Sequence, residues 1–265
     1  MTVGEYTDTF HRFECMFSRF LDLLCPPVCP ICGGIIDGGM PFCRNCVQKM
    51  VTPDGQFCPR CGGRRFRQRK ETSDCLRCQS AKYLFRRVIA LGEYETELRK
   101  IVLKMKTDKT GFLAVAAAAL LTTYRGNDLQ EAKPDLIVPI PMYPQRRKSR
   151  GVNSPDILAA ELGRFLKIPV AKNVIRRIRK THYQFMLSVR ERAENVADAF
   201  ALNPIRNCPF FRRRQSGLAG KNVLLVDDIL TTGSTCNEVA GILLHCGAAA
   251  VTVVVLARAE GNSQK

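Results

Sequence analysis

The sequence predicts an α/β protein in which helices cover a parallel β-sheet, preceded by two small metal-binding modules. Three observations lead to this prediction. Four C-x-x-C pairs lie within the first 78 residues. After residue 80, short apolar runs of strand type alternate with helical runs, a pattern typical of a parallel sheet. One apolar run, VLLVDDILTTGST (223–235), ends in two acids and a loop of small hydroxylated residues.

The N-terminal segment has apolar side chains at helical spacing, including Phe10, Phe13, Phe17 and Leu24. We expect an amphipathic helix that docks on another part of the protein, with binding to a membrane surface as the alternative. The first eight residues, MTVGEYTD, hold two acids and no basic residue. The sequence therefore predicts no secretory signal and a cytoplasmic location. No apolar run approaches the roughly 18 residues of a membrane-spanning helix.

Eight cysteines form a tandem repeat. Each half opens with CPxCGG and closes with a second C-x-x-C pair after ten or thirteen residues. Two such pairs supply the four thiolates that a tetrahedral Zn²⁺ prefers, from a segment too short to build a core. The repeat predicts two structural Zn²⁺ ions, one on Cys29, Cys32, Cys43 and Cys46 and one on Cys58, Cys61, Cys75 and Cys78. An interleaved pairing would use the same residues, Cys25 could replace a ligand, and redox or disulfide chemistry is the alternative.

After residue 80 the chain alternates between apolar runs typical of strands and runs with the periodicity of helices. Strands are predicted at 85–94, 135–140, 168–175, 221–228 and 250–257, and helices at 95–105, 112–124, 154–166 and 231–247. In open parallel sheets, ligands bind beyond the carboxyl ends of the strands. We therefore expect the site where LIVPI leads into PMYPQRRKSRG and where VLLVDD leads into ILTTGST.

The two acids and the loop after them suit a sugar phosphate. Thr231, Thr232, Gly233, Ser234 and Thr235 are expected at a helix N-terminus, where free N–H groups and hydroxyls can surround a phosphate monoester. Asp227 and Asp228 come just before them, where they can accept hydrogen bonds from the hydroxyls of an attached ribose. A helix cap beside a solvated acid is the plain alternative. The P-loop and dinucleotide fingerprints are absent from the sequence.

These residues carry a resemblance to a known family. VLLVDDILTTGST resembles the loop that binds phosphoribosyl pyrophosphate (PRPP) in type I phosphoribosyltransferases, and the whole chain resembles the ComF family. VPIPMYPQRRKSRGVN (138–153), THYQFMLSVRERAENVADAF (181–200) and GAAAVTVVVLAR (247–258) are also similar to segments of that family. The resemblance implies a type I phosphoribosyltransferase fold, a Rossmann-like parallel sheet, with an N-terminal double zinc ribbon. The expected domains are a helix at 1–24, the double ribbon at 25–80, the phosphoribosyltransferase-like domain at 81–260 and a tail at 261–265.

The resemblance also implies roles for single residues. Asp227 and Asp228 would be the catalytic pair that holds ribose, residues 231–235 would hold the 5-phosphate, and Mg²⁺ would bind with PRPP. The pyrophosphate side would consist of Arg146, Arg147 and Arg150. A mobile loop over the site would contain Thr181, Gln184, Leu187, Arg190, Arg192 and Asn195. The chain has RGVNS at 150–154 where the family usually has RGFNQ, a difference that alters contacts near the acceptor.

The function that the resemblance implies is transfer of a phosphoribosyl group from PRPP, or another ribose 5-phosphate compound, to an unidentified acceptor, linked to DNA uptake or nucleotide metabolism. The alternative is a non-catalytic module that senses PRPP or binds single-stranded DNA. The net charge of +17 favours polyanionic partners. The stretch RRFRQRK (64–70) sets five basic residues around Phe66, a combination suited to single strands. DNA-uptake proteins are further partners that the resemblance implies.

Overall fold

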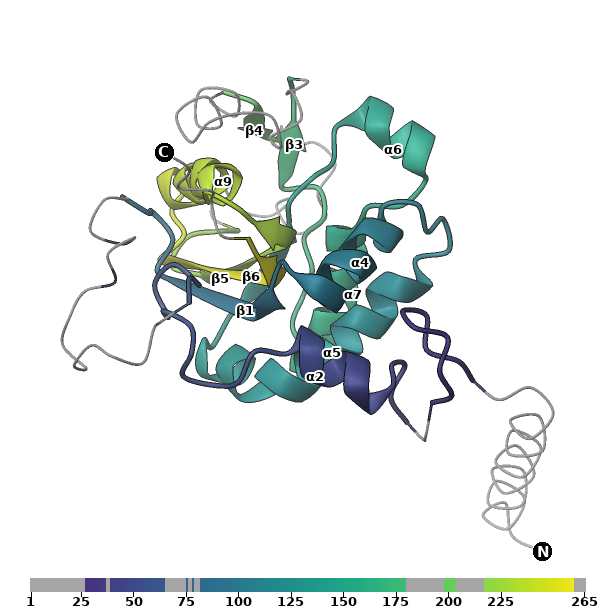
Figure 1. Ribbon diagram of the computed structural model, residues 1–265. Helices are drawn as coiled ribbons and strands as arrows, with labels where there is room; N and C mark the ends of the chain where they lie inside the picture. Colours follow the sequence, from purple (N-terminus) through teal and green to yellow (C-terminus); the bar gives the residue numbers. More distant parts are fainter. Residues whose placement is uncertain are drawn as a thin grey trace, which may run out of the picture. The chain divides into compact units, whose positions relative to one another are not determined.

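The computed structural model (Figure 1) describes residues 27–36, 39–64, 75, 78, 82–179, 198–203 and 217–259. The chain forms two compact units, Met1–Val47 and Gln48–Lys265. Several predicted features lie outside the described residues: the helix at 1–24, Cys25, the basic stretch beyond Arg64 and the loop segment 181–195. These features stay predictions.

A four-stranded parallel sheet forms the centre of the second unit. Its strands are β1 (Arg87–Glu93), β2 (Leu136–Pro139), β5 (Asn222–Leu230) and β6 (Ala250–Arg258), in the order β1-β6-β5-β2. All three pairings are parallel, which confirms the predicted sheet. A separate pair, β3 (Ile175–Arg177) and β4 (Phe200–Leu202), is antiparallel. In Figure 1 this pair and α6 (Pro144–Arg150), the helix that follows β2, lie at the top of the view, with β3 between β4 and α6.

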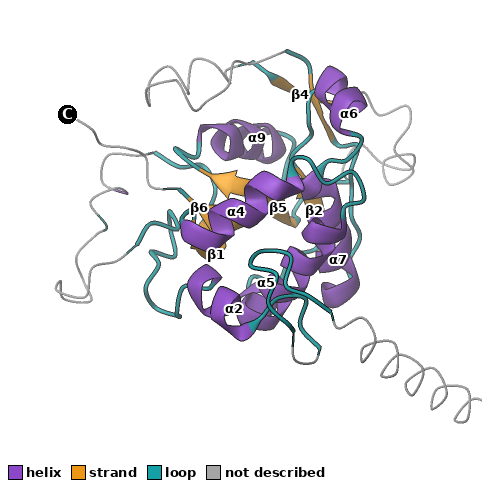
Figure 2. Cartoon of the chain, turned by 45° about the vertical axis from the view of Figure 1, so that its right-hand side comes forward, coloured by secondary structure: helices purple, strands orange, loops and turns teal. Residues whose placement is uncertain are grey.

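Helices cover both faces of this sheet (Figure 2). α4 (Thr96–Met105), α5 (Phe112–Glu131) and α7 (Ser154–Leu166) pack on one face, and α9 (Ser234–His245) packs on the other. Successive residues of a strand point to opposite faces, so Val223 and Leu225 share a buried core with Val239 and Leu243 of α9. Asp227 continues this row of β5 side chains and therefore lies on the α9 face. α2 (Arg44–Met50) precedes all these elements.

Two predicted elements differ from the structure. The strand predicted at 168–175 is wrong: Val170 makes a single bridge to Ile137, and β3 begins only at Ile175, because a turn at 172–173 interrupts the apolar run. α5 continues to Glu131, beyond the predicted end at residue 124. The first residue beyond the predicted end, Arg125, is buried. Its Nε donates a hydrogen bond to the carbonyl of Ala90 at 2.8 Å, so a tertiary contact with β1 extends the helix.

Within the part of the chain that is described, no helix has both the length and the hydropathy needed to cross a bilayer.

Candidate phosphate site and metal centres

The predicted phosphate loop lies between β5 and α9. β5 ends at Leu230 and α9 begins at Ser234, so the first backbone N–H groups of a 12-residue helix point into the loop. The hydroxyls of Thr232 and Ser234 are 2.8 Å apart, and the N–H of Ser234 donates to Oγ1 of Thr232 at 3.3 Å. Helix N–H groups and two neighbouring hydroxyls make a set of donors suited to an anion.

Gly233 fixes the shape of this loop. Its φ of 88° lies in the left-handed region that favours glycine. A Cβ at this position would lie 2.9 Å from Cε1 of Tyr83, whose ring stacks on Phe85 with centroids 4.7 Å apart. The Tyr83 hydroxyl also donates to the carbonyl of Thr232 at 3.4 Å. The loop is therefore packed tightly against an aromatic pair from the segment before β1.

The two acids lie at the carboxyl end of β5, one on each face of the strand. The N–H of Asp228 donates to Oδ1 of Asp227 at 2.9 Å. Burial raises the pKa of Asp227 well above its usual range, and the neighbouring charge of Asp228 raises it further. On the other face, burial raises the pKa of Tyr94, and Asp228 adds to that rise. A cation or hydroxyl donors placed at this pair would stabilise the ionised carboxylates.

Arg177 on β3 supplies positive charge near the acid pair. Burial lowers the pKa of Arg177, the charge of Arg146 on α6 lowers it further, and Asp227 opposes the shift. The Arg177 guanidinium lies 5.2 Å from the centre of the Phe200 ring, which holds it in place. The structure thus brings Arg177 within electrostatic range of both Arg146 and Asp227. The sequence marked Arg146 as a site residue but gave no signal for Arg177 beyond its place in a basic run.

The other predicted arginines of α6 differ in their surroundings. Arg147 is largely exposed and forms an ion pair with Asp156 of α7 at 3.2 Å. Asp156 also accepts a hydrogen bond at 2.9 Å from the buried side chain of Asn153, which donates to the carbonyl of Ile140 as well. Arg147 therefore helps to join α6 to α7. Arg150 ends α6, and its side chain lies outside what the structure describes.

The eight predicted zinc ligands gather into two groups of four. The sulfurs of Cys29, Cys32, Cys43 and Cys46 lie within 4.8 Å of one another, as do those of Cys58, Cys61, Cys75 and Cys78. The distance between the sulfurs is 3.6 Å for Cys32 and Cys43, and 3.7 Å for both Cys58 to Cys78 and Cys61 to Cys75. Four sulfurs at 2.3 Å from a tetrahedral Zn²⁺ lie about 3.8 Å apart. Both groups fit one Zn²⁺ each, in the consecutive rather than the interleaved arrangement.

The backbone around each first pair is the same in both groups. The N–H of Gly33 donates to the carbonyl of Cys29, and the N–H of Gly62 donates to the carbonyl of Cys58, both at 2.8 Å. Both glycines have positive φ, 75° and 67°, as the CPxCGG repeat requires. The hydrogen bond between the Cys58 and Cys61 sulfurs lowers the pKa of Cys58 to about 4 and raises the pKa of Cys61, so within this pair the Cys58 sulfur is the first to form the thiolate that binds zinc.

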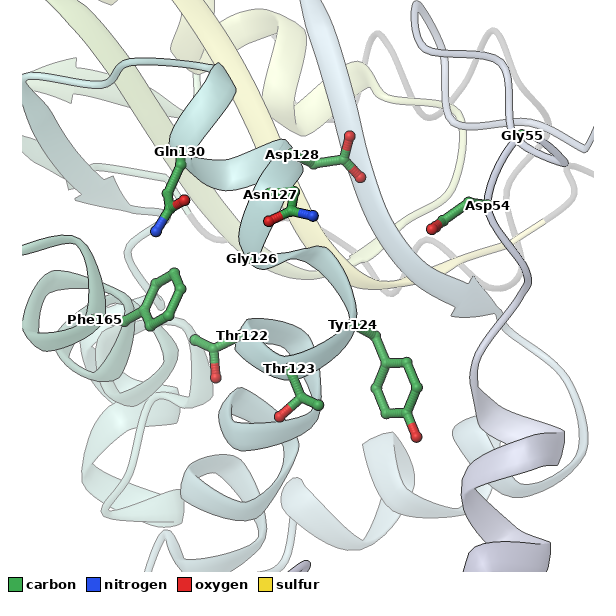
Figure 3. Close-up of a pocket in the computed structure, with 10 residues that line it drawn as sticks. All are labelled: Asp54, Gly55, Thr122, Thr123, Tyr124, Gly126, Asn127, Asp128, Gln130 and Phe165. Atoms are coloured by element: carbon green, nitrogen blue, oxygen red, sulfur yellow. The ribbon is translucent and has the colours of Figure 1, made fainter.

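A separate polar pocket of about 420 Å³ lies between α5, the segment at Asp54 and Gly55, and Phe165 of α7 (Figure 3). Its lining has no lysine or arginine. Its two acids are already in ion pairs, Asp54 with Arg125 and Asp128 with Arg87. Arg87 begins β1, so this pocket lies toward the amino ends of the strands, away from the phosphate loop. Its charge and position do not suit a phosphate.

Comparison with known proteins matches both halves of the chain. A family model described as phosphoribosyl transferase domain matches residues 113–265, and one described as double zinc ribbon domain matches residues 20–79. The chain is 30% identical to Competence protein F of Haemophilus influenzae, over 82% of this chain and 90% of that protein. It is 31% identical to DNA utilization protein YhgH of Escherichia coli, over 89% and 99%. The chain belongs to the ComF family. Competence protein ComFC of Bacillus subtilis is a more distant relative, 25% identical over 78% of this chain and 80% of that protein.

Membership in the ComF family confirms the predicted fold class, a phosphoribosyltransferase fold with a double zinc ribbon. The two four-cysteine groups support structural zinc in those ribbons. The individual site roles at 146–150, 181–195 and 227–235 stay predictions, as do the domain boundaries at 24, 80 and 260.

Proposed function

We propose that this ComF-family protein binds PRPP, or another ribose 5-phosphate compound, together with Mg²⁺ at residues 227–235. Catalysis would be phosphoribosyl transfer to an acceptor. The observation that carries the proposal is the direct succession of an acid pair at a strand end and a phosphate-type helix N-terminus. The acid pair suits the hydroxyls of the ribose, and the helix N-terminus suits the 5-phosphate.

The loop would bind the 5-phosphate through its N–H groups and hydroxyls. α9 is a 12-residue helix, so its N-terminus carries a partial positive charge that favours the phosphate. Gly233 supplies the left-handed backbone conformation of the loop, and the side on which a Cβ would stand faces the Tyr83 ring. Asp227 and Asp228 would then accept hydrogen bonds from the two ribose hydroxyls, one step nearer to the strand.

The acid pair also fits Mg²⁺. This ion is usually held by one or two carboxylates together with substrate phosphates and water. The raised pKa of Asp227 reflects burial beside a second carboxylate, and a bound cation would offset both effects. When bound with PRPP, Mg²⁺ would neutralise charge on the pyrophosphate. Arg146 and Arg177 would add to that neutralisation from α6 and β3.

Isothermal titration calorimetry with PRPP, with and without Mg²⁺, tests this proposal. Asp227→Asn with Asp228→Asn replaces two charged acceptors by neutral amides, which should cost about 1–3 kcal/mol in all, so affinity should fall roughly 5- to 150-fold. Asp128→Asn is the matched control, because Asp128 is paired with Arg87 at the opposite end of the sheet. Absence of PRPP binding by the native protein, or unchanged affinity in the double variant, would contradict the proposal. Pyrophosphate release with a panel of bases would separate turnover from binding.

Single-stranded DNA binding is a second proposal, favoured by the charge of +17 and by relatives named for competence and DNA utilization. The basic stretch 64–70 is its expected contact surface. Arg64, which the structure describes, pairs with Glu93 at 3.3 Å, so the DNA contacts would come from the residues after it. A cytoplasmic location and contacts with DNA-uptake proteins belong to the same proposal.

A further inference from the structure

Arg258 is a buried cation beside the phosphate loop. It is the last residue of β6 and only 2% exposed. Its Nη1 donates to the carbonyls of Leu230, Thr231 and Ala259, and its Nε donates to the carbonyl of Cys61 at 2.9 Å. Leu230 ends β5, Thr231 begins the phosphate loop, and Cys61 is a ligand of the second zinc group. One side chain therefore joins the metal centre to the loop.

The zinc turn 58–63 also packs directly on the sheet. The N–H of Val88 in β1 donates to the carbonyl of Pro59 at 2.8 Å. At Gly62, an added Cβ would lie 2.7 Å from Cγ1 of Val88 and 3.5 Å from Cδ of Arg258. The close fit leaves no room for a side chain at Gly62. The position of this turn is therefore coupled to the position of Arg258.

A second connection runs through Tyr83. Nη2 of Arg60, inside the zinc turn, donates to the carbonyl of Tyr83 at 2.6 Å. The Tyr83 hydroxyl donates to the carbonyl of Thr232, and its ring lies against Gly233. The next residue, Leu84, donates its N–H to Oδ1 of Asn237 in the first turn of α9, at 2.6 Å. The zinc turn thus reaches the loop from the Arg258 side and from the Tyr83 side.

We propose that Arg258 is a positioning residue for the phosphate loop, and that zinc at Cys58, Cys61, Cys75 and Cys78 holds it in place. A four-thiolate zinc turn takes its shape from the metal because it has no core of its own. Loss of that zinc would release the carbonyl of Cys61 and the side chain of Arg60, and the loop would lose contacts on both sides. Phosphate affinity would then follow zinc occupancy of the second group. The part that concerns affinity rests on the proposed function.

The test compares matched cysteine variants. Cys58→Ser with Cys61→Ser removes two ligands of the second group, and Cys29→Ser with Cys32→Ser makes the same change in the first group, which belongs to the other compact unit. Each variant should lose one zinc equivalent. Only the second-group variant should speed hydrogen exchange at the amides of 231–235 and weaken PRPP binding by roughly tenfold or more, the loss expected for one charge-assisted hydrogen bond.

Arg258→Met tests the link without touching a zinc ligand. With both zinc ions retained, it should also speed exchange at 231–235, whereas Arg87→Met, at the amino end of the neighbouring strand, should not. If the second-group variant misfolds, chelation and return of zinc in the Cys29→Ser, Cys32→Ser background gives a reversible version. The amides of α5 then report whether the fold persists.

Unchanged exchange at 231–235 after loss of the second zinc, or native exchange in Arg258→Met, would overturn the inference. If the native protein binds no PRPP while loop exchange still follows zinc, the proposed function fails and the positioning role stands. If PRPP binds but neither loop exchange nor affinity follows zinc, the positioning role of Arg258 fails and the proposed function stands.

Discussion

Replacement of Gly233 by alanine should destabilise the fold by more than its backbone conformation alone requires. An L-residue in the left-handed region costs about 1–2 kcal/mol, and the lower entropy of the unfolded alanine chain returns about 0.4–1 kcal/mol. At Gly233 the new methyl would also lie 2.9 Å from the Tyr83 ring. That ring cannot move freely because it stacks on the fully buried Phe85. Overpacking of this kind costs a further 1–3 kcal/mol or so.

Gly220→Ala isolates the backbone part of this cost. Gly220 has a φ of 71°, and nothing lies within 4 Å of an added Cβ. Urea denaturation of both zinc-loaded variants should give free energies of unfolding that differ by about 1–3 kcal/mol, with Gly233→Ala the less stable. Equal stability within about 0.5 kcal/mol would refute the view that Tyr83 and Phe85 form a rigid wall of the phosphate loop.

Three other results are expected. Elemental analysis of the native protein should find two zinc equivalents, and only one after Cys58→Ser with Cys61→Ser; one equivalent in the native protein would contradict the two-group arrangement. Because the pKa of Asp227 is raised in the folded protein, its protonated form contributes stability below about pH 3.9, and this stability is lost as pH rises through the folded-state pKa. Asp227→Asn removes the buried carboxylate that is ionised at higher pH, so it should raise the unfolding midpoint of the ligand-free protein at neutral pH. An unchanged pH profile would contradict this. Alanine at the three arginines within 65–69 should flatten the salt dependence of single-stranded DNA binding by about 2 units of log K per log salt, whereas Phe66→Ala should weaken binding by about 1–3 kcal/mol at constant slope. Native affinity and slope in the arginine variant would remove the loop from the DNA proposal.

The parts of the fold that the sequence predicts well are those with a local cause. The periodicity of 154–166 gives α7 with both ends correct. The apolar run before Asp227 and the small residues after it predict β5, the loop and α9 to within a few residues. The cysteine repeat predicts both metal groups because ligand spacing within a zinc turn is itself a local property.

The features that the sequence predicts less well depend on partners distant in sequence. α5 continues beyond residue 124 because the side chain of buried Arg125 donates hydrogen bonds to backbone carbonyls of β1. In the sequence this charged residue suggests the end of the helix, whereas in the structure it holds the helix against the sheet. β3 and β4 are three residues each, and they pair with one another although more than twenty residues of sequence lie between them. Short strands of this kind have no periodicity of their own to detect.

The same cause hides two basic side chains beside the predicted site. Arg177 belongs to a basic run that resembles a solvated surface, yet Phe200 and the charges of Arg146 and Asp227 surround it. Arg258 is the last residue of an apolar strand and is almost fully buried, which is rare for arginine. One of the four carbonyls that accept its hydrogen bonds belongs to Cys61, 197 residues away in sequence. Loop residues can show what kind of ligand a site would take, but the hydrogen bonds that Arg258 and Tyr83 donate to the loop carbonyls leave no pattern in the loop itself. For that reason the zinc ribbon should be tested as part of the phosphate site and not only as a separate domain.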